Sequence, residues 1–200
     1  MNGELVVGEE IAVVALDESG RLNVQRTKFD FHLAGAALAE LRHQNRVQAD
    51  DRTLRGWDVE PTGHPVLDEA VRRLGRPGPN VRIERAIATV AGTARRAVFG
   101  HLVETGTLTV QPGGFLRATR YTTVRRSADG VRTDLLRAEA GDPTAHERSL
   151  IAFLRSLGWL PEILRLPPTD SRLDSLTRSA ADEWGPSAVR RALDFFRAPH

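Results

Sequence analysis

The sequence has no cysteine, which excludes disulfide bonds, thiol nucleophiles and cysteine-ligated metals. Lysine is almost absent as well, because Lys28 is the single lysine and arginine supplies the remaining basic charge. No apolar run approaches the ~20 residues that span a bilayer. The first ten residues, MNGELVVGEE, are acidic and lack the basic and apolar segments of a secretory signal. We therefore expect a cytoplasmic protein without a membrane-spanning helix.

Motifs of common enzyme chemistries are also missing: the sequence has no GxSxG, P-loop, HExxH or glycine-rich dinucleotide loop. The histidines show no metal-ligand spacing with a nearby carboxylate, and we interpret each as a surface or cap residue. They are His32, His43, His64, His101, His146 and His200. Glu9 and Glu10 point in different directions on a helix, so we interpret them as solvated or capping groups. We therefore expect no catalysis, cofactor or bound metal.

Charge is distributed unevenly in a chain whose formal net charge is only +2. Residues 1–70 carry 7 basic and 13 acidic side chains, residues 71–137 carry 13 and 4, and residues 138–200 carry 8 and 9. The basic middle third indicates an anionic partner such as nucleic acid, a membrane surface or a phosphate ligand. The alternative is that the acidic flanks fold over this region and neutralise it.

Apolar periodicity predicts a mainly α chain. We expect N-caps at Asp30, Asn80, Asp142 and Ser187, from the side chains that accept hydrogen bonds at helix starts. The predicted helical segments are 9–20, 30–45, 64–75, the segment after Asn80 that carries Ile83, Ile87 and Val90, 141–158, 166–185 and 186–200. Pro65 is expected near the first turn of 64–75 and Gly75 at its C-cap, and 166–185 is expected to break at its double proline and restart near Asp170. An apolar helix followed by a short hairpin occurs twice, and QPGGF is the second hairpin turn.

Two adjacent arginines, Arg95 and Arg96, lie within the stretch ATVAGTARRAVFGHLVETGTLTV. At 100° per residue the buried stripe of this helix comprises Ile87, Ala91, Ala94, Val98 and Leu102. Arg95 lies on the shoulder of the stripe, where it must snorkel, pair with a carboxylate or hold an anion. Arg96 points away from the stripe, toward solvent.

The same helix with its basic hairpin has a second interpretation, a winged-helix module that binds nucleic acid. Its wing would carry Arg117, Arg120, Arg125 and Arg126. The preceding segment, VRIERAIATVAG, offers few side chains that could contact base edges. We therefore do not expect nucleic acid to be the partner.

Six stretches occur in an order that resembles the Golgi phosphoprotein 3-like family, which has bacterial as well as eukaryotic members. They are EEIAVVALDESGRL, LAGAALAELRHQNRV, PTGHPVLDEAV, RRAVFGHLVETGTL, TRYTT and RSLIAFLRSLGWLPEIL. The arginine-rich composition is more similar to that of a bacterial member. The resemblance implies one domain over residues 1–200, with a central helical bundle ringed by amphipathic helices and short β-hairpins.

The resemblance also implies a non-catalytic peripheral membrane adaptor that binds phosphatidylinositol 4-phosphate and retains protein cargo. Aligned without gaps, the family's pocket positions fall on Gln25, Ala34, Gly92 and Arg95, so only the last arginine is kept. We therefore expect Arg95 and Arg96 to contact an anionic head group. A late hairpin in the family aids self-association and membrane approach, and the corresponding residues here are Phe115, Arg117, Arg120, Tyr121, Arg125 and Arg126.

The leading hypothesis is thus an adaptor on the cytoplasmic face of a membrane that binds anionic phospholipid head groups through its basic middle third. Exposed arginines near an anionic leaflet contribute about 1 kcal/mol each. A protein-interaction or nucleic-acid-binding module is the second hypothesis, and a small-molecule binder is the third.

Overall fold

The computed structural model describes residues 5–22, 24–50, 52–75, 80–111, 119–123 and 128–197. The helices within these ranges are α1 (Val7–Val14), α2 (Arg26–His43), α3 (Pro65–Leu74), α4 (Ile83–Glu104), α5 (Ala128–Glu139), α6 (Ala145–Leu157), α7 (Leu160–Leu164), α8 (Ser171–Ser179) and α9 (Trp184–Arg197). The strands are β1 (Val47–Ala49), β2 (Thr53–Trp57), β3 (Val81–Arg82), β4 (Leu108–Gln111) and β5 (Arg120–Thr123). The prediction of a mainly α domain with short hairpins is confirmed.

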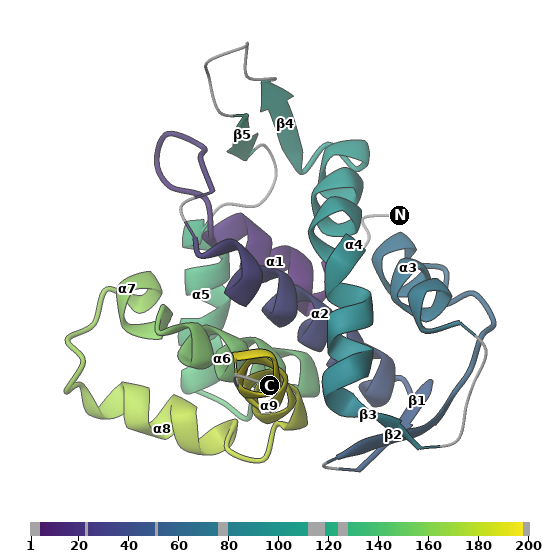
Figure 1. The fold of residues 1–200 in the computed structure, drawn as a ribbon. Coiled ribbons are helices and arrows are strands. Elements are labelled where there is room, and N and C mark those ends of the chain that lie inside the picture. The colour runs from purple at the N-terminus through teal and green to yellow at the C-terminus, as the bar shows by residue number, and fades with distance from the viewer. Residues whose placement is uncertain are drawn as a thin grey trace.

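The long helices α2 and α4 form the centre of the domain, and α1, α3, α6 and α9 pack around them (Figure 1). The predicted stripe of α4 is buried in full, at Ile87, Ala91, Ala94, Val98 and Leu102. Small residues let the helices approach closely. A Cβ at Gly35 of α2 would collide with Val189 of α9, so the packing of these two helices requires glycine there.

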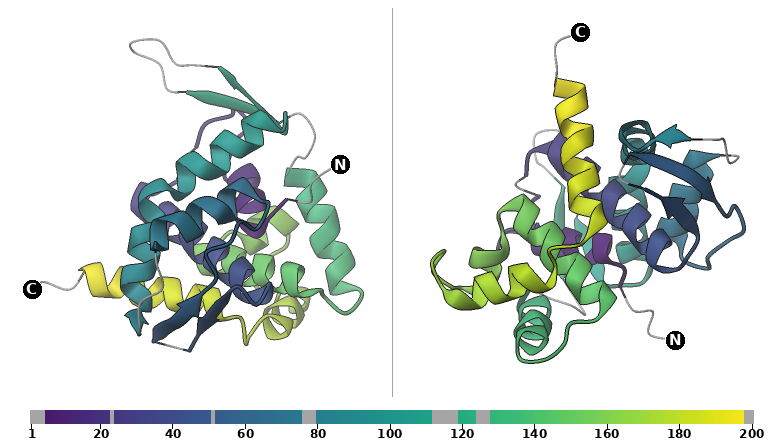
Figure 2. Two further views of the ribbon diagram at one scale, coloured as in Figure 1. Left: turned by 90° about the vertical axis from the view of Figure 1, so that its right-hand side faces the viewer. Right: turned by 90° about the horizontal axis from the view of Figure 1, so that it is seen from below.

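Both predicted helix–hairpin units are present. The chain runs from α2 into the antiparallel pair β1–β2 and from α4 into the antiparallel pair β4–β5. The strand β3, which the sequence did not predict, adds to β2 and leads directly into α4. The three-stranded sheet therefore lies at the beginning of α4, and the β4–β5 hairpin extends from its end (Figure 2). Residues 112–118, including most of QPGGF, lie outside the described ranges.

The predicted boundaries of α3 are confirmed, with Pro65 in the first turn and Gly75 at the C-cap with a φ of 71°. Two predicted N-caps are wrong. Asp30 lies inside α2, because the helix begins at Arg26 and brings this carboxylate one turn past the helix start. Asn80 adopts a φ of 54° ahead of β3, and Arg82 is the residue before α4.

Two further predicted caps, Asp142 and Ser187, are also wrong. Thr144 caps α6 instead, since its hydroxyl accepts from the Glu147 amide and the Glu147 carboxylate accepts from the Thr144 amide. This reciprocal pair satisfies two amides at once. The last helix begins at Trp184, so Ser187 lies within its first turn, where its hydroxyl donates to the Trp184 carbonyl. The predicted restart at Asp170 is confirmed as the N-cap of α8.

A tight turn after α1 docks against the β4–β5 hairpin. The backbone amide of Tyr121 donates to the carbonyl of Gly20 at 2.7 Å. Gly20 has a φ of 73°, and a Cβ there would collide with the Tyr121 carbonyl. Glycine is therefore required for this approach, which brings the turn, α2, α4 and β5 together around one hollow.

Candidate functional site

A cavity of about 1000 Å³ opens between the turn after α1, the first turns of α2, the middle of α4 and strand β5. The described residues that line it are Asp17, Arg21, Leu22, Arg26, Asp30, Ala91, Gly92, Arg95, Arg96, Phe99, Thr119 and Tyr121. Four arginines and two aspartates give this lining an excess of two positive charges. We call it the arginine pocket.

The arginines come from three separate elements. Arg21 follows the turn, Arg26 is the first residue of α2, and Arg95 and Arg96 lie in the middle of α4. Arg21, Arg26 and Arg96 are exposed, whereas Arg95 is half-buried. The predicted difference between Arg95 and Arg96 is thus confirmed, although both side chains line the pocket.

The two aspartates of the pocket are engaged within the protein. Arg95 Nε lies 3.5 Å from Asp30 Oδ1, so of the three alternatives for Arg95 the pairing with a carboxylate is present. Burial raises the pKa of Asp30, and the nearby Arg95 and Arg26 oppose that rise. Asp17 accepts hydrogen bonds from the Ser19 and Arg21 amides, which shape the turn. The exposed Arg21, Arg26 and Arg96 line the same cavity.

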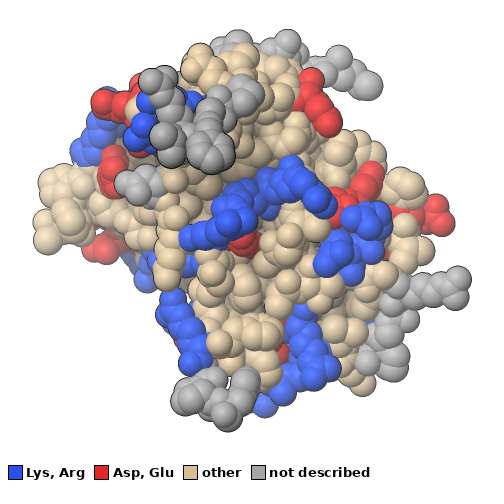
Figure 3. Space-filling model, turned by 45° about the horizontal axis from the view of Figure 1, so that its top comes forward, with Lys and Arg blue, Asp and Glu red and all other residues tan. Residues whose placement is uncertain are grey.

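The basic character extends over the surface around the hairpin. Figure 3 shows lysine and arginine side chains running across the middle of this face, while most acidic side chains on it lie near the edges. Flanking acidic residues neutralise the middle third at some positions, as Glu69 does for Arg72 and Asp30 does for Arg95. The expectation of neutralising flanks therefore holds locally and leaves a basic surface.

Of the six predicted hairpin residues, Arg120 and Tyr121 lie within the described ranges. Arg120 is exposed on β5, opposite Gln111 of β4. Tyr121 is half-buried and packs on Phe99, with ring centroids 4.7 Å apart, so it forms a wall of the pocket. Phe115, Arg117, Arg125 and Arg126 lie outside the described residues, and their membrane-facing role stays a prediction.

The pocket positions implied by gap-free alignment do not converge. Gly92 lines the arginine pocket. Ala34 is fully buried in the core, so a side chain at this position does not face the pocket. Gln25 lines a different cavity, of about 560 Å³, between α2, α6 and α9. Arg21 and Arg26 are the pocket residues that sequence reasoning missed, because their proximity to α4 arises from packing.

The histidine and glutamate interpretations need correction. His32 is only 2% exposed, with its ring between the Lys28 carbonyl and the Ser156 hydroxyl, and burial lowers its pKa to about 4. Glu9 is fully buried and Glu10 is 3% exposed, so neither is solvated. Glu9 does act as a capping group, since its Oε2 accepts from the Val6 amide at 3.1 Å.

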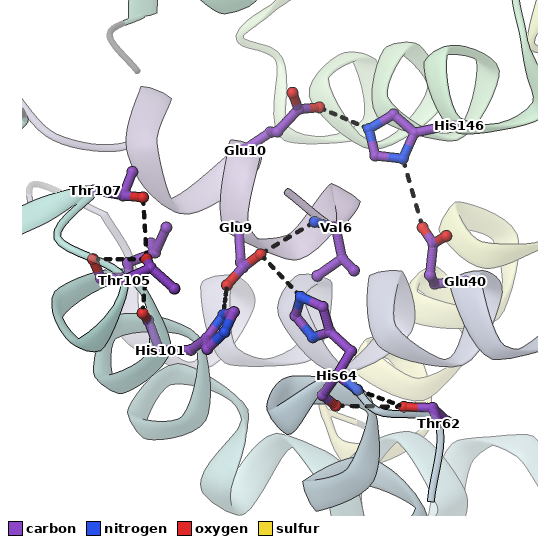
Figure 4. Close-up of polar contacts among 11 residues, drawn as sticks. Val6, Glu9, Glu10, Glu40, Thr62, His64, His101, Thr105, Thr107 and His146 are labelled. Atoms are coloured by element: carbon purple, nitrogen blue, oxygen red, sulfur yellow. Dashed lines mark hydrogen bonds and ion pairs between the residues drawn. The ribbon is translucent and has the colours of Figure 1, made fainter. Parts of the chain in front are cut away.

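The carboxylate of each of these glutamates contacts at least one histidine imidazole (Figure 4). His101 Nδ1 lies 2.5 Å from Glu9 Oε1, and His64 Nε2 lies 3.4 Å from Glu9 Oε2. On the other side of α1, His146 Nε2 lies 2.9 Å from Glu10 Oε2. These histidines are half-buried partners of core carboxylates, which the linear spacing did not indicate.

A winged-helix arrangement is not favoured by the packing. The helix that leads into the hairpin, α4, is covered by α2, α3 and α9, and its described apolar stripe is buried. A recognition helix must present side chains to a groove. This helix instead occupies the centre of the domain.

The fold and the pocket together define a class: a helical domain with a basic hollow beneath a hairpin. In the described part of the chain, no helix combines the length and the apolarity needed to cross a membrane. The family model for Golgi phosphoprotein 3 (GPP34) matches residues 7–195. The chain therefore belongs to the Golgi phosphoprotein 3 family. Comparison with curated proteins gives no match.

Proposed function

We propose that this protein is a non-catalytic peripheral membrane adaptor that binds the phosphorylated head group of an anionic phospholipid in the arginine pocket. The observation that carries the proposal is the convergence of Arg21, Arg26, Arg95 and Arg96 on one cavity. Guanidinium groups bind phosphate through forked hydrogen bonds and do not lose their charge near neutral pH.

The four arginines of the pocket differ in burial, so we propose different roles for them. Arg95 is half-buried and lies 3.5 Å from Asp30, so it is the more restricted positive charge of the pocket. Arg21, Arg26 and Arg96 are exposed, so they would be free to reorient toward a phosphate. Membership in the Golgi phosphoprotein 3 family supports phosphatidylinositol 4-phosphate as the first head group to test.

The membrane approach uses the hairpin face. Arg120 and the basic residues beyond it would meet an anionic leaflet, since each exposed arginine there contributes about 1 kcal/mol. The adaptor would lie on the cytoplasmic face of the membrane and hold a protein cargo. Self-association would use the same hairpin.

Vesicle co-sedimentation tests the pocket. We compare vesicles of phosphatidylcholine alone, with phosphatidylserine, and with phosphatidylinositol 4-phosphate at matched surface charge. The variant Arg26→Gln/Arg96→Gln should bind the phosphoinositide vesicles about 30-fold more weakly, which corresponds to two contacts of about 1 kcal/mol. The matched control Arg155→Gln/Arg190→Gln removes the same charge from the other cavity and should retain most of the binding.

The outcomes separate three interpretations. Equal recovery with neutral and anionic vesicles at low salt would contradict binding of an anionic head group. Equal weakening by the pocket and control variants would show nonspecific attraction and reject the pocket. Tight, salt-sensitive binding to duplex DNA without vesicle binding would favour the nucleic-acid module instead.

A further inference from the structure

A second constellation, separate from the arginine pocket, lies in the core between α1, α3 and α4. Glu9 comes from α1, His101 from the last turn of α4, and His64 directly precedes α3. Figure 4 shows both imidazoles directed at the Glu9 carboxylate. We call these three residues the Glu9 cluster. Among the described residues, one ligand atom from each member lies within 4.8 Å of the other two.

The donor set suits a borderline divalent metal ion. Two imidazoles and one carboxylate bind Zn²⁺ at about 2.0–2.2 Å, which places neighbouring donor atoms of a tetrahedral site ~3.3 Å apart. His64 Nε2 and Glu9 Oε2 are already 3.4 Å apart. His101 Nδ1 and Glu9 Oε1, at 2.5 Å, share a hydrogen bond that an ion would replace. The three ligand atoms lie within 4.8 Å of one another, so a spacing of ~3.3 Å requires side-chain adjustments of up to ~1.5 Å.

The two imidazoles of the cluster contact opposite oxygens of one carboxylate. His101 lies on Glu9 Oε1 and His64 on Glu9 Oε2. The two rings lie edge to face, with centroids 4.7 Å apart. One carboxylate is therefore shared by two imidazoles, which brings three side chains that can ligate a metal ion to one place.

We propose that the Glu9 cluster binds one Zn²⁺ ion, with Glu9, His64 and His101 as protein ligands and a fourth position open to water. Because the ligands come from three elements, the bound ion would tie α1 to α3 and α4. Binding of the ion to the folded state alone raises the free energy of unfolding by mass action. This site does not depend on lipid binding.

Metal titration of chelator-treated protein tests the proposal. The wild type should bind Zn²⁺ with a stoichiometry of one by calorimetry, and Co²⁺ should give the ligand-field bands of a low-coordinate site. His101→Gln should bind Zn²⁺ at least about 100-fold more weakly, since even loss of an outer-shell partner costs 10–100-fold. The matched control His43→Gln removes a half-buried histidine that pairs with Glu183 and should bind as the wild type does.

A measurement on the wild type alone guards against variants that do not fold. In ¹⁵N spectra of the imidazoles, Zn²⁺ should shift the resonances of His64 and His101 and leave those of His43 and His146 in place. Absence of stoichiometric binding would overturn the proposal. So would equal loss of binding in His101→Gln and His43→Gln, or shifts confined to other histidines.

Discussion

Glu9 and Glu10 are sequence neighbours on the same short helix, yet they lie in opposite electrostatic settings. Glu9 faces α3 and α4, where His64 and His101 share its single carboxylate. Glu10 faces α6, where its carboxylate and that of Glu40 share the single imidazole of His146. One side of α1 thus has two imidazoles for one carboxylate, and the other side has the inverse ratio.

The ratio of carboxylates to imidazoles decides in which direction the pKa of the shared group is shifted. Burial alone would lower the pKa of His146, but attraction from Glu10 and Glu40 raises it to about 10. His146 is therefore a cation that compensates buried negative charge. Burial would likewise raise the pKa of Glu9, but hydrogen bonds from His64, His101 and the Val6 amide hold it below its ordinary value. On the Glu9 side the carboxylate is the charged centre and the imidazoles are its donors.

The substitution His146→Gln should have the largest effect on this comparison. It removes the imidazole that lies between the buried Glu10 and the half-buried Glu40, and breaking a buried pair costs about 3–5 kcal/mol. Because the His146 side chain is about one quarter exposed, we expect the lower end, about 3 kcal/mol. Urea unfolding monitored by circular dichroism measures the loss. A decrease in the free energy of unfolding below about 1 kcal/mol would show that water screens the ion pairs of His146.

The pH dependence of that loss is the second test. A group with a raised pKa stabilises the fold fully below its unfolded pKa of about 6.5, and this contribution fades as the pH rises toward about 10. The free-energy difference between the wild type and His146→Gln should therefore be largest near pH 6 and shrink steadily toward pH 10. Unfolding curves at several pH values measure it. A difference that stays constant from pH 6 to 10 would contradict a charged His146.

The features of the fold that the sequence predicted correctly are those that depend on local patterns of residues. The buried stripe of α4, the boundaries of α3 at Pro65 and Gly75, and both helix–hairpin units follow from periodicity and turn chemistry. The predicted N-cap before α6 failed because two nearby residues, Asp142 and Thr144, could both serve. There the reciprocal bond with Glu147 decided the helix start.

Local patterns did not predict the arginine pocket or the Glu9 cluster, because each joins segments that are distant in the sequence. Glu9 and His101 are 92 positions apart, and Arg26 reaches the pocket only because α2 packs on α4. A count of charge along the chain assigned the arginines to the middle third, whereas two of the four pocket arginines come from the first third. Spacing rules for metal ligands likewise detect pairs on one helix, and the Glu9 cluster uses three elements.

On the Glu9 side, His101→Gln in chelated buffer should destabilise the protein by about 1–3 kcal/mol, the cost of leaving a buried hydrogen-bonding group without its partner. The loss is smaller than on the Glu10 side, because Glu9 keeps His64 and the Val6 amide. Thermal and urea unfolding measure it. A loss as large as that of His146→Gln would remove the distinction between the two sides of α1.

The smallest effect should come from Glu40→Gln. His146 keeps Glu10 at 2.9 Å, while Glu40 lies 3.7 Å away, beyond hydrogen-bond length. The longer contact contributes little, so we expect a change below about 1 kcal/mol in the free energy of unfolding. The pKa of His146 should nevertheless fall from about 10, because one of its two anions is gone. An NMR titration of His146 measures that fall, and an unchanged midpoint would show that Glu10 alone holds the proton.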